Sequence, residues 1–209
     1  MPMALDRFLA SLRDTARTYN VVLTESILEK LARYYALLLK WNERLHLVAP
    51  CSPEEFGTRH VLESLMVVRH LSPDACVADI GSGAGLPIIP CLVAREDIQA
   101  VLFESSKRKT VFLREALKAV ECQDRAEIVP RQFQVTKAPK VQFVTCRAID
   151  QFERLLPALI EWSPPMSTLL LFGGESIVKQ LRRKLNSVTV ERLPGSERRF
   201  LALAQNTVS

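Results

Sequence analysis

The chain has 209 residues, of which 48% are hydrophobic and 24% are charged. This composition is ordinary for a soluble globular protein with one sizeable core. No stretch approaches the roughly 20 apolar residues of a membrane-spanning helix, and the N-terminus lacks the long apolar segment of a secretory signal. The sequence therefore excludes a membrane-spanning chain and predicts a cytoplasmic protein. Its net charge of +5 favours a polyanionic partner.

The cysteine residues show neither a metal-binding nor a disulfide pattern. Their number is odd, they are scattered, and no Cys-x-x-Cys pair or histidine at ligand spacing accompanies them. We expect reduced thiols and no bound metal. A nucleophilic cysteine is the less favoured alternative, because no histidine lies beside one in the sequence. The five are Cys51, Cys76, Cys91, Cys122 and Cys146.

The first 72 residues have the pattern of amphipathic helices. Apolar residues recur at helical spacing over 5–12 and again over 27–45, which gives each segment one apolar face. A Ser-Pro-Glu-Glu capping box predicts a third helix over 53–70. We interpret residues 1–72 as an N-terminal helical extension that packs on the same domain as the rest of the chain and covers one end of its sheet.

From residue 73 onward, predicted strands and helices alternate. This order predicts one α/β domain, residues 73–209, in which helices cover both faces of a mostly parallel, seven-stranded sheet. A Pro-Gly-Ser turn at 194–196 joins the last two strands like a hairpin, so the final strand should be antiparallel. The strands are predicted at 76–80, 100–104, 126–129, 141–146, 168–172, 187–192 and 199–204, and the helices near 86–95, 107–121, 150–161 and 174–185.

The segment after the first predicted strand has the composition of a nucleotide-binding loop. Gly81, Gly83 and Gly85 remove side chains where the chain must turn and approach a ligand. Pro87 suits the start of the next helix, whose N-terminal amides carry a partial positive charge. Strand, loop and helix together predict a nucleotide pocket.

Two acidic residues distinguish this pocket from a dinucleotide site. The loop reads Asp-x-Gly-x-Gly-x-Gly, with Asp79 two residues before the first glycine, whereas dinucleotide folds use Gly-x-Gly-x-x-Gly. A carboxylate there suits a cationic or hydroxyl-bearing ligand better than a phosphate. Glu104 ends the second predicted strand, 25 residues later, where an acid can accept both hydroxyls of a ribose. An ordinary tight turn and a nicotinamide-dinucleotide site are the alternatives.

The spacing of these residues resembles the first motif of the S-adenosylmethionine (AdoMet) methyltransferases of Rossmann-like fold. Motifs from about residue 37 to 175 further resemble the RsmG (GidB) family of small-subunit ribosomal RNA guanine-N7 methyltransferases. They are Leu39-Lys40-Trp41-Asn42, Arg59-His60-Val61-Leu62-Glu63-Ser64, Asp79 to Pro87, Glu104-Ser105, Arg108-Lys109, Phe112-Leu113 and Cys146-Arg147-Ala148. The resemblance implies a class I AdoMet-dependent methyltransferase fold with a seven-stranded, mostly parallel sheet and an N-terminal helical extension.

Several positions depart from the family's pattern. His46-Leu47-Val48 replaces an asparagine-leucine-threonine run, Glu63 replaces an aspartate, and Phe172 replaces the lysine before the late glycine pair. Where the family often has arginine-x-glutamate near the adenine, this chain has Arg131-Gln132-Phe133. The cofactor half of the pattern is thus better kept than the substrate half. AdoMet-dependent methylation of another RNA or a small molecule, and a non-catalytic RNA-binding paralogue, are the alternatives.

The implied reaction needs no general base. Guanine N7 carries a lone pair and no proton, so alignment and electrostatics can supply catalysis of methyl transfer from a sulfonium. We predict that Arg147, at the end of the fourth predicted strand, is the catalytic residue, because a guanidinium can bond guanine O6 or a flanking phosphate. A structural salt bridge is the alternative for this arginine.

The loop, the strand ends and the resemblance together predict two sets of contact residues. The RNA, free or in a ribosomal particle, is expected to contact Arg59, His60, Lys107, Arg108 and Lys109. The last three lie at a helix start, where the macrodipole disfavours cations, and a solvated face is the alternative to an RNA phosphate. AdoMet is expected to contact Asp79, Gly81, Ser82, Gly83, Ala84, Gly85, Leu86, Pro87, Glu104, Ser105, Gln132, Phe133 and Arg147, with Phe133 covering the adenine and Gln132 bonding its edge. The oligomeric state does not follow from the sequence.

Overall fold

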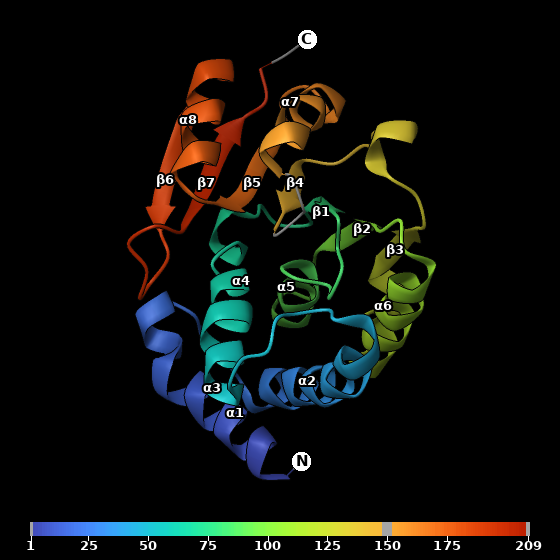
Figure 1. Cartoon of the computed structure of the whole chain (residues 1–209), viewed down its shortest axis with the longest axis vertical. Helices are drawn as coiled ribbons and strands as arrows, with labels where there is room; N and C mark the ends of the chain where they lie inside the picture. The colour runs from blue at the N-terminus through green and yellow to red at the C-terminus, as the bar shows by residue number, and fades with distance from the viewer. Residues whose placement is uncertain (1, 148–151, 208–209) are drawn as a thin grey trace.

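The computed structural model describes residues 2–147 and 152–207 and is centred on one sheet of seven strands (Figure 1). The strand order is β3-β2-β1-β4-β5-β7-β6, in which β1 to β5 are parallel and β7 is antiparallel to both neighbours. The order reverses between β1 and β4, which is where doubly wound sheets bind ligands. The strands are β1 Cys76–Ile80, β2 Gln99–Phe103, β3 Ala126–Val129, β4 Phe143–Cys146, β5 Thr168–Gly173, β6 Val188–Arg192 and β7 Phe200–Gln205.

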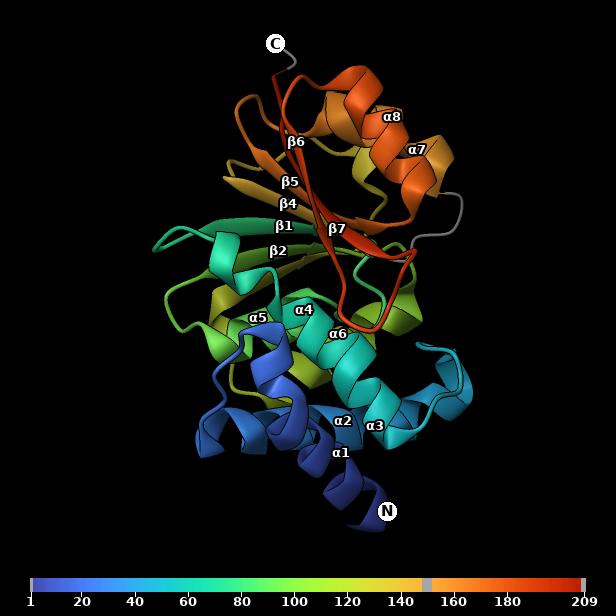
Figure 2. The same ribbon diagram turned by 90° about the vertical axis from the view of Figure 1, so that its left-hand side faces the viewer.

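Helices cover both faces of this sheet (Figure 2). Helices α7 and α8 lie on one face, and α5 and α6 lie on the other, with α1 and α2 in a further layer beyond them. The α-helices are α1 Pro2–Thr15, α2 Glu25–Leu45, α3 Pro53–Glu55, α4 Glu63–Leu65, α5 Ile88–Ala94, α6 Lys107–Ala119, α7 Phe152–Trp162 and α8 Glu175–Lys184. Shorter 3-10 turns are η1 Ala16–Tyr19, η3 Val68–His70, η4 Gln123–Arg125 and η5 Phe133–Val135, and η2 Phe56–Leu62 is a π-helix.

Local capping explains where the N-terminal helices begin. The Thr24 hydroxyl accepts a hydrogen bond from the Ile27 amide at 3.3 Å, and the Ser52 hydroxyl accepts one from the Glu55 amide at 3.1 Å. From there α3, η2 and α4 follow one another directly and form a single helical segment, residues 53–65. This segment carries the predicted contact residues of the extension towards the sheet.

The predicted secondary structure agrees closely with the observed elements. All seven strands and the antiparallel final strand are confirmed. Helix α7 corresponds to the predicted helix over 150–161, although residues 150 and 151 lie outside the described residues, as does Ala148 of the Cys-Arg-Ala motif. Helices α1 and α2 of the extension lie one layer from the sheet, α2 against α5 and α6, whereas the segment 53–65 reaches the carboxyl end of the sheet, where Glu63 pairs with Arg147. The apolar face of the extension needs a partner surface, and α5 and α6 provide one, because residues of all three belong to one apolar cluster.

Two expected absences can be compared with the described part of the chain. None of the helices in that part is both long enough and apolar enough to cross a membrane. Within residues 2–147 and 152–207, no three histidine, cysteine or acidic side chains group together as potential metal ligands.

Gly85 ties the loop after β1 to the helical layer. Its φ is +81°, and a Cβ atom at this position would lie 2.3 Å from Ile89 Cδ1 and 3.3 Å from Leu113 Cδ2. Ile89 belongs to α5 and Leu113 to α6, so a side chain would push the loop away from both helices. Glycine is therefore required both for the backbone conformation and for the close packing.

We expect Gly85→Ala to lower the free energy of unfolding by about 2–5 kcal/mol, the sum of left-handed backbone strain and overpacking. Gly195→Ala is the matched control, because Gly195 also has a positive φ, +69°, but nothing within 4 Å of its Cβ position. The control should lose only about 1–2 kcal/mol. Urea unfolding measures both values, and equal losses would contradict the packing argument.

Candidate functional site

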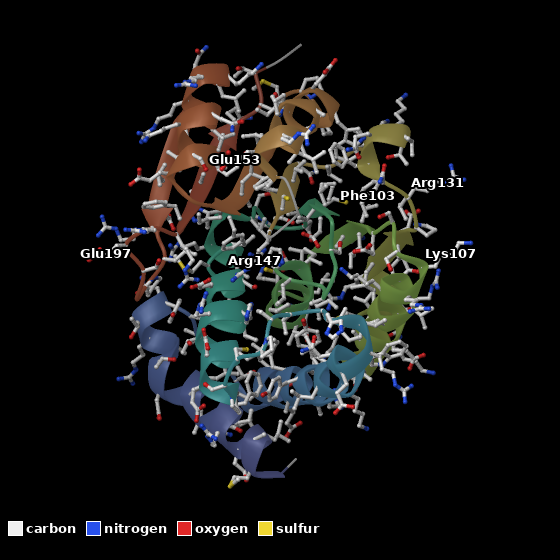
Figure 3. The ribbon with its side chains drawn as sticks, viewed as in Figure 1. Phe103, Lys107, Arg131, Arg147, Glu153 and Glu197 are labelled. Atoms are coloured by element: carbon white, nitrogen blue, oxygen red, sulfur yellow. The ribbon has the colours of Figure 1, made fainter. Side chains whose placement is uncertain are left out.

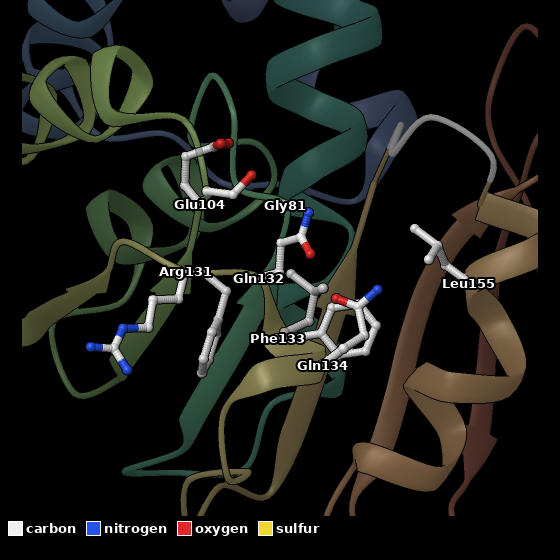
Figure 4. Close-up of a pocket in the computed structure, with 10 residues that line it drawn as sticks. Gly81, Glu104, Arg131, Gln132, Phe133, Gln134 and Leu155 are labelled. Carbon is white, nitrogen blue, oxygen red and sulfur yellow. The ribbon is translucent and has the colours of Figure 1, made fainter.

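The site lies at the carboxyl end of β1 and consists of two neighbouring cavities. The first, of about 190 Å³, is lined by residues from the ends of β1 and β2 and from the segment 131–134 (Figure 4). The second, of about 290 Å³, is lined by residues 47–49, His60, the glycine loop, Lys109 and Arg147. Gly81 lines both cavities, so the glycine loop forms their shared boundary.

Glu104 organises the first cavity. Its Oε2 accepts a hydrogen bond from the Gly83 amide at 2.9 Å, and its Oε1 accepts one from the Ser106 amide at 2.7 Å. The side chain is buried but faces the cavity, and each carboxylate oxygen keeps a further lone pair for a ligand hydroxyl. Glu104 thus holds the loop in place as well as lining the predicted nucleoside site.

The opposite wall of the first cavity combines apolar and polar side chains. Phe133 is buried and packs edge-on against Trp162, with the ring centroids 5.5 Å apart. Gln132 extends toward Gly81, whereas Arg131 points away from it (Figure 4). Phe133 and Gln132, both predicted adenine contacts, therefore lie opposite Glu104 in one cavity. This donor, acceptor and apolar set fits a nucleoside.

Tyr34 anchors the loop from the helical extension. Its hydroxyl donates a hydrogen bond of 2.6 Å to the Ala84 carbonyl, and the side chain is fully buried in α2. Burial raises the pKa of Tyr34, so the hydroxyl stays protonated and remains a donor. Tyr34 falls within the segment 27–45, for which the sequence predicts one apolar face. Periodicity alone cannot tell which member of a stripe reaches a loop 50 residues away.

Asp79 lies beneath the loop and lines neither cavity. It is fully buried, its Oδ1 accepts a hydrogen bond from the Thr145 hydroxyl at 2.8 Å, and its Oδ2 has no partner among the described residues. Burial raises the pKa of Asp79 to about 7, although the Ser82 and Thr145 hydroxyls oppose the shift. Direct contact between Asp79 and AdoMet remains a prediction.

Arg147 reaches the second cavity from the end of β4. Its Nη2 donates to the Glu63 carboxylate at 2.9 Å and to the Arg59 carbonyl at 2.5 Å, and its guanidinium lies 4.8 Å from the centroid of the Phe172 ring. Its Nη1 is buried and has no hydrogen-bond partner within residues 2–147 and 152–207. Burial lowers the pKa of Arg147, and Glu63 opposes that shift. The predicted salt bridge and the predicted ligand contact are therefore compatible, because different nitrogens serve them.

His60 lines the second cavity as a neutral side chain. Burial, followed by the charges of Arg147 and Arg59, lowers the pKa of His60 to about 4. The imidazole packs at a tilt against Phe56, with the ring centroids 5.2 Å apart. At neutral pH His60 can offer a hydrogen bond but not a positive charge.

The structure separates the other predicted RNA contacts. Lys109 is half-buried and lines the second cavity, whereas Lys107 and Arg108 are exposed and line neither cavity. Arg59 is exposed and forms an ion pair with Glu55. Arg147 lies near the middle of the molecule and Lys107 at its outer edge (Figure 3).

Most of the chain matches the profile of a known family. A profile of the family described as rRNA small subunit methyltransferase G (GidB) covers residues 27–206. The Ribosomal RNA small subunit methyltransferase G of Chromobacterium violaceum is 33% identical over 70% of this chain and 70% of its own. The protein of the same name from Nitrosomonas eutropha is 38% identical over 61% of this chain and 59% of its own. This chain belongs to the GidB family.

Membership of this family confirms the predicted AdoMet-dependent methyltransferase activity. Solved structures of methyltransferases share the fold of this chain at low sequence identity. An RNA methyltransferase from Salinibacter ruber, in complex with S-adenosyl-L-homocysteine, has a TM-score of 0.58 and 16% identity over 78% of this chain and 95% of its own. The tRNA (m1A58) methyltransferase TrmI from Aquifex aeolicus has a TM-score of 0.56 and 12% identity over 70% of this chain and 69% of its own. The class I fold is thereby confirmed.

We expect Tyr34→Phe to weaken AdoMet binding. The substitution leaves the buried Ala84 carbonyl without its donor, which costs about 1–3 kcal/mol and lets the loop shift. Calorimetric titration should show a dissociation constant raised about tenfold or more. Tyr35→Phe is the matched control, because it leaves the Tyr34 to Ala84 bond intact, and an equal loss in both variants would contradict the anchoring role.

Asp79 should make stability fall as pH rises. Its folded-state pKa of about 7 exceeds the unfolded value, so between about pH 4 and pH 7 the folded state binds more protons. As pH rises through this range, the free energy of unfolding of Asp79→Asn should therefore increase relative to that of the wild type by up to about 1.4 kcal/mol per pH unit. Asp97→Asn is the control: Arg95 lowers the pKa of Asp97, so its difference from wild type should stay flat between pH 5 and 8 in urea unfolding.

Proposed function

We propose that this GidB-family protein transfers the methyl group of AdoMet to guanine N7 in small-subunit ribosomal RNA. One observation carries the acceptor assignment. Arg147, whose buried Nη1 has no hydrogen-bond partner among the described residues, lines a cavity that shares Gly81 with the nucleoside cavity. A base that enters the second cavity therefore meets a buried donor beside the cofactor loop.

The first cavity is the proposed cofactor site. Glu104 would accept the ribose hydroxyls, while Gln132 and Phe133 would bind the adenine from the opposite wall. Glu104 holds the Gly83 amide of the loop on one side, and Tyr34 holds the Ala84 carbonyl on the other. When bound, AdoMet supplies an electrophilic methyl group on a sulfonium.

The second cavity is the proposed acceptor site. Guanine presents O6 and N7 as neighbouring acceptors on its major-groove edge. Arg147 Nη1 would donate to O6, which orients the base and leaves N7 free of a donor. At neutral pH His60 is uncharged and Arg147 stays protonated, so Arg147 cannot act as a base. The reaction needs no base, because N7 bears no proton. The residues of the cavity contribute orientation and a positive potential.

The RNA assignment rests on the family and on charge. The relatives from Chromobacterium violaceum and Nitrosomonas eutropha bear names that state a ribosomal RNA small-subunit substrate. The chain carries a net charge of +5, and Lys107, Arg108 and Arg131 are exposed. Free RNA and the assembled small-subunit particle are both possible forms of the substrate, and we propose a cytoplasmic location for the enzyme.

Transfer of labelled methyl from AdoMet to under-methylated small-subunit RNA, alone and with its ribosomal proteins, tests this function. Wild-type protein should label guanine N7, identified by borohydride reduction and aniline cleavage at the methylated base. Arg147→Ala should lower kcat/KM by roughly 100-fold through loss of a buried donor, with AdoMet affinity nearly unchanged. Gly83→Arg should lose AdoMet binding, because its side chain would enter the loop between the cavities.

Transcripts made with 7-deazaguanosine are the control for the acceptor atom, since they lack N7 but keep O6. They should accept no label. Label that persists on them would overturn the N7 assignment while leaving the cofactor site intact. AdoMet binding without transfer to either form of the RNA would overturn the substrate assignment and favour another acceptor.

A further inference from the structure

A buried carboxylate joins two arginines beside the acceptor cavity. Glu63 is fully buried in α4, and its Oε2 accepts a hydrogen bond from Arg147 Nη2 at 2.9 Å. Its Oε1 accepts one from Arg199 Nη1 at 2.6 Å. The three residues come from the helical extension, the end of β4 and the hairpin before β7. They are distant in sequence and meet only in the folded protein.

We propose that Glu63 is a positioning residue that holds Arg147 in the acceptor cavity, and that Arg199 completes this clamp. The inference rests on the proposed function, since the arginine it positions is the one assigned to the acceptor base. Neither Glu63 nor Arg199 lines the cavity. Both would therefore act on the reaction only through Arg147.

The contacts of Arg147 fix both its Nη2 atom and one face of its guanidinium. That nitrogen is shared between the Glu63 carboxylate and the Arg59 carbonyl, while the Phe172 ring lies against the guanidinium. A guanidinium is planar, so fixing one nitrogen and one face also directs the remaining nitrogen. Nη1 is the nitrogen left without a partner among the described residues. The clamp thus determines the direction in which the Nη1 donor points.

Arg199 keeps the carboxylate from turning. With both oxygens engaged, Glu63 cannot rotate without breaking a charge-assisted bond. Arg199 is itself held by Ser196, whose Oγ accepts hydrogen bonds from its backbone amide at 3.1 Å and from its Nε at 3.2 Å. The hairpin between β6 and β7 is therefore mechanically connected to the acceptor cavity.

The charge balance of the clamp also suits an electron-rich acceptor. Two guanidinium groups share one carboxylate, which leaves one positive charge in a region where Arg147 is only 11% exposed. Replacing Glu63 by glutamine would leave two positive charges facing each other with no carboxylate between them. Arg147 would then move away from Arg199 and out of its present position.

The test is a double-mutant cycle on methyl transfer to small-subunit RNA. We expect Glu63→Gln to lower kcat about 10- to 100-fold by displacing Arg147, with the KM for AdoMet unchanged. Glu63→Asp keeps the charge and should recover part of this loss. In the Arg147→Ala background Glu63→Gln should cause no further loss, whereas a general structural role would multiply the two effects. Glu54→Gln is the control, because it removes an exposed partner of Arg7 on the same helical segment.

A second measurement does not depend on activity. In ¹⁵N NMR spectra, a clamped guanidinium gives resolved Nη–H signals, because its rotation is slow. The signals of Arg147, assigned by their loss in Arg147→Lys, should be present in wild type and Glu63→Asp and absent in Glu63→Gln. Arg199→Met should weaken them and reduce kcat several-fold, which provides the answer if Glu63→Gln does not fold.

The outcomes separate this inference from the proposed function. An active wild type with unchanged kcat in folded Glu63→Gln would overturn the clamp alone. If wild-type protein methylates no ribosomal RNA, the proposed function fails and the NMR signals decide the clamp. Their persistence in Glu63→Gln would overturn it, and their loss would support it.

Discussion

The geometry of the site depends on the two hydrogen bonds of the Glu104 carboxylate. Because β1 and β2 are parallel neighbours in register, both strands end at the same edge of the sheet. Glu104 follows β2 and binds the Gly83 amide of the loop after β1, while its other oxygen binds the Ser106 amide at the start of α6. One side chain thereby fixes the loop between the two cavities and the helix that presents Lys109 to the second.

Three buried acidic residues in this region meet the cost of burial in different ways. Glu104 is stabilised by backbone amides and Glu63 by two arginines. Asp79 has one hydroxyl partner and no ion pair within the described ranges, so burial moves its pKa to about 7. The surroundings, and not the residue type, therefore decide how each buried carboxylate is accommodated.

The sequence predicted the elements well because each is encoded locally. Short apolar runs, capping residues and the glycine loop identified every strand and placed Glu104 at the correct edge. The side-chain partnerships could not be predicted in this way. The bond from Tyr34 to Ala84 spans 50 residues, and the bond from Arg199 to Glu63 spans 136. Such contacts depend on how layers pack, and no spacing along the chain encodes them.

Phe172 shows how a departure from the family's pattern can shape a site without removing it. A lysine at this position would add a third cation beside Arg147 and Arg199, which share a single carboxylate. The phenylalanine ring instead supports the face of the Arg147 guanidinium and competes for none of its in-plane donors. The arginine can then be buried and held by Glu63 through Nη2, while its Nη1 has no hydrogen-bond partner among the described residues. For a reaction that removes no proton, an oriented donor and a positive potential are the contributions the protein must make.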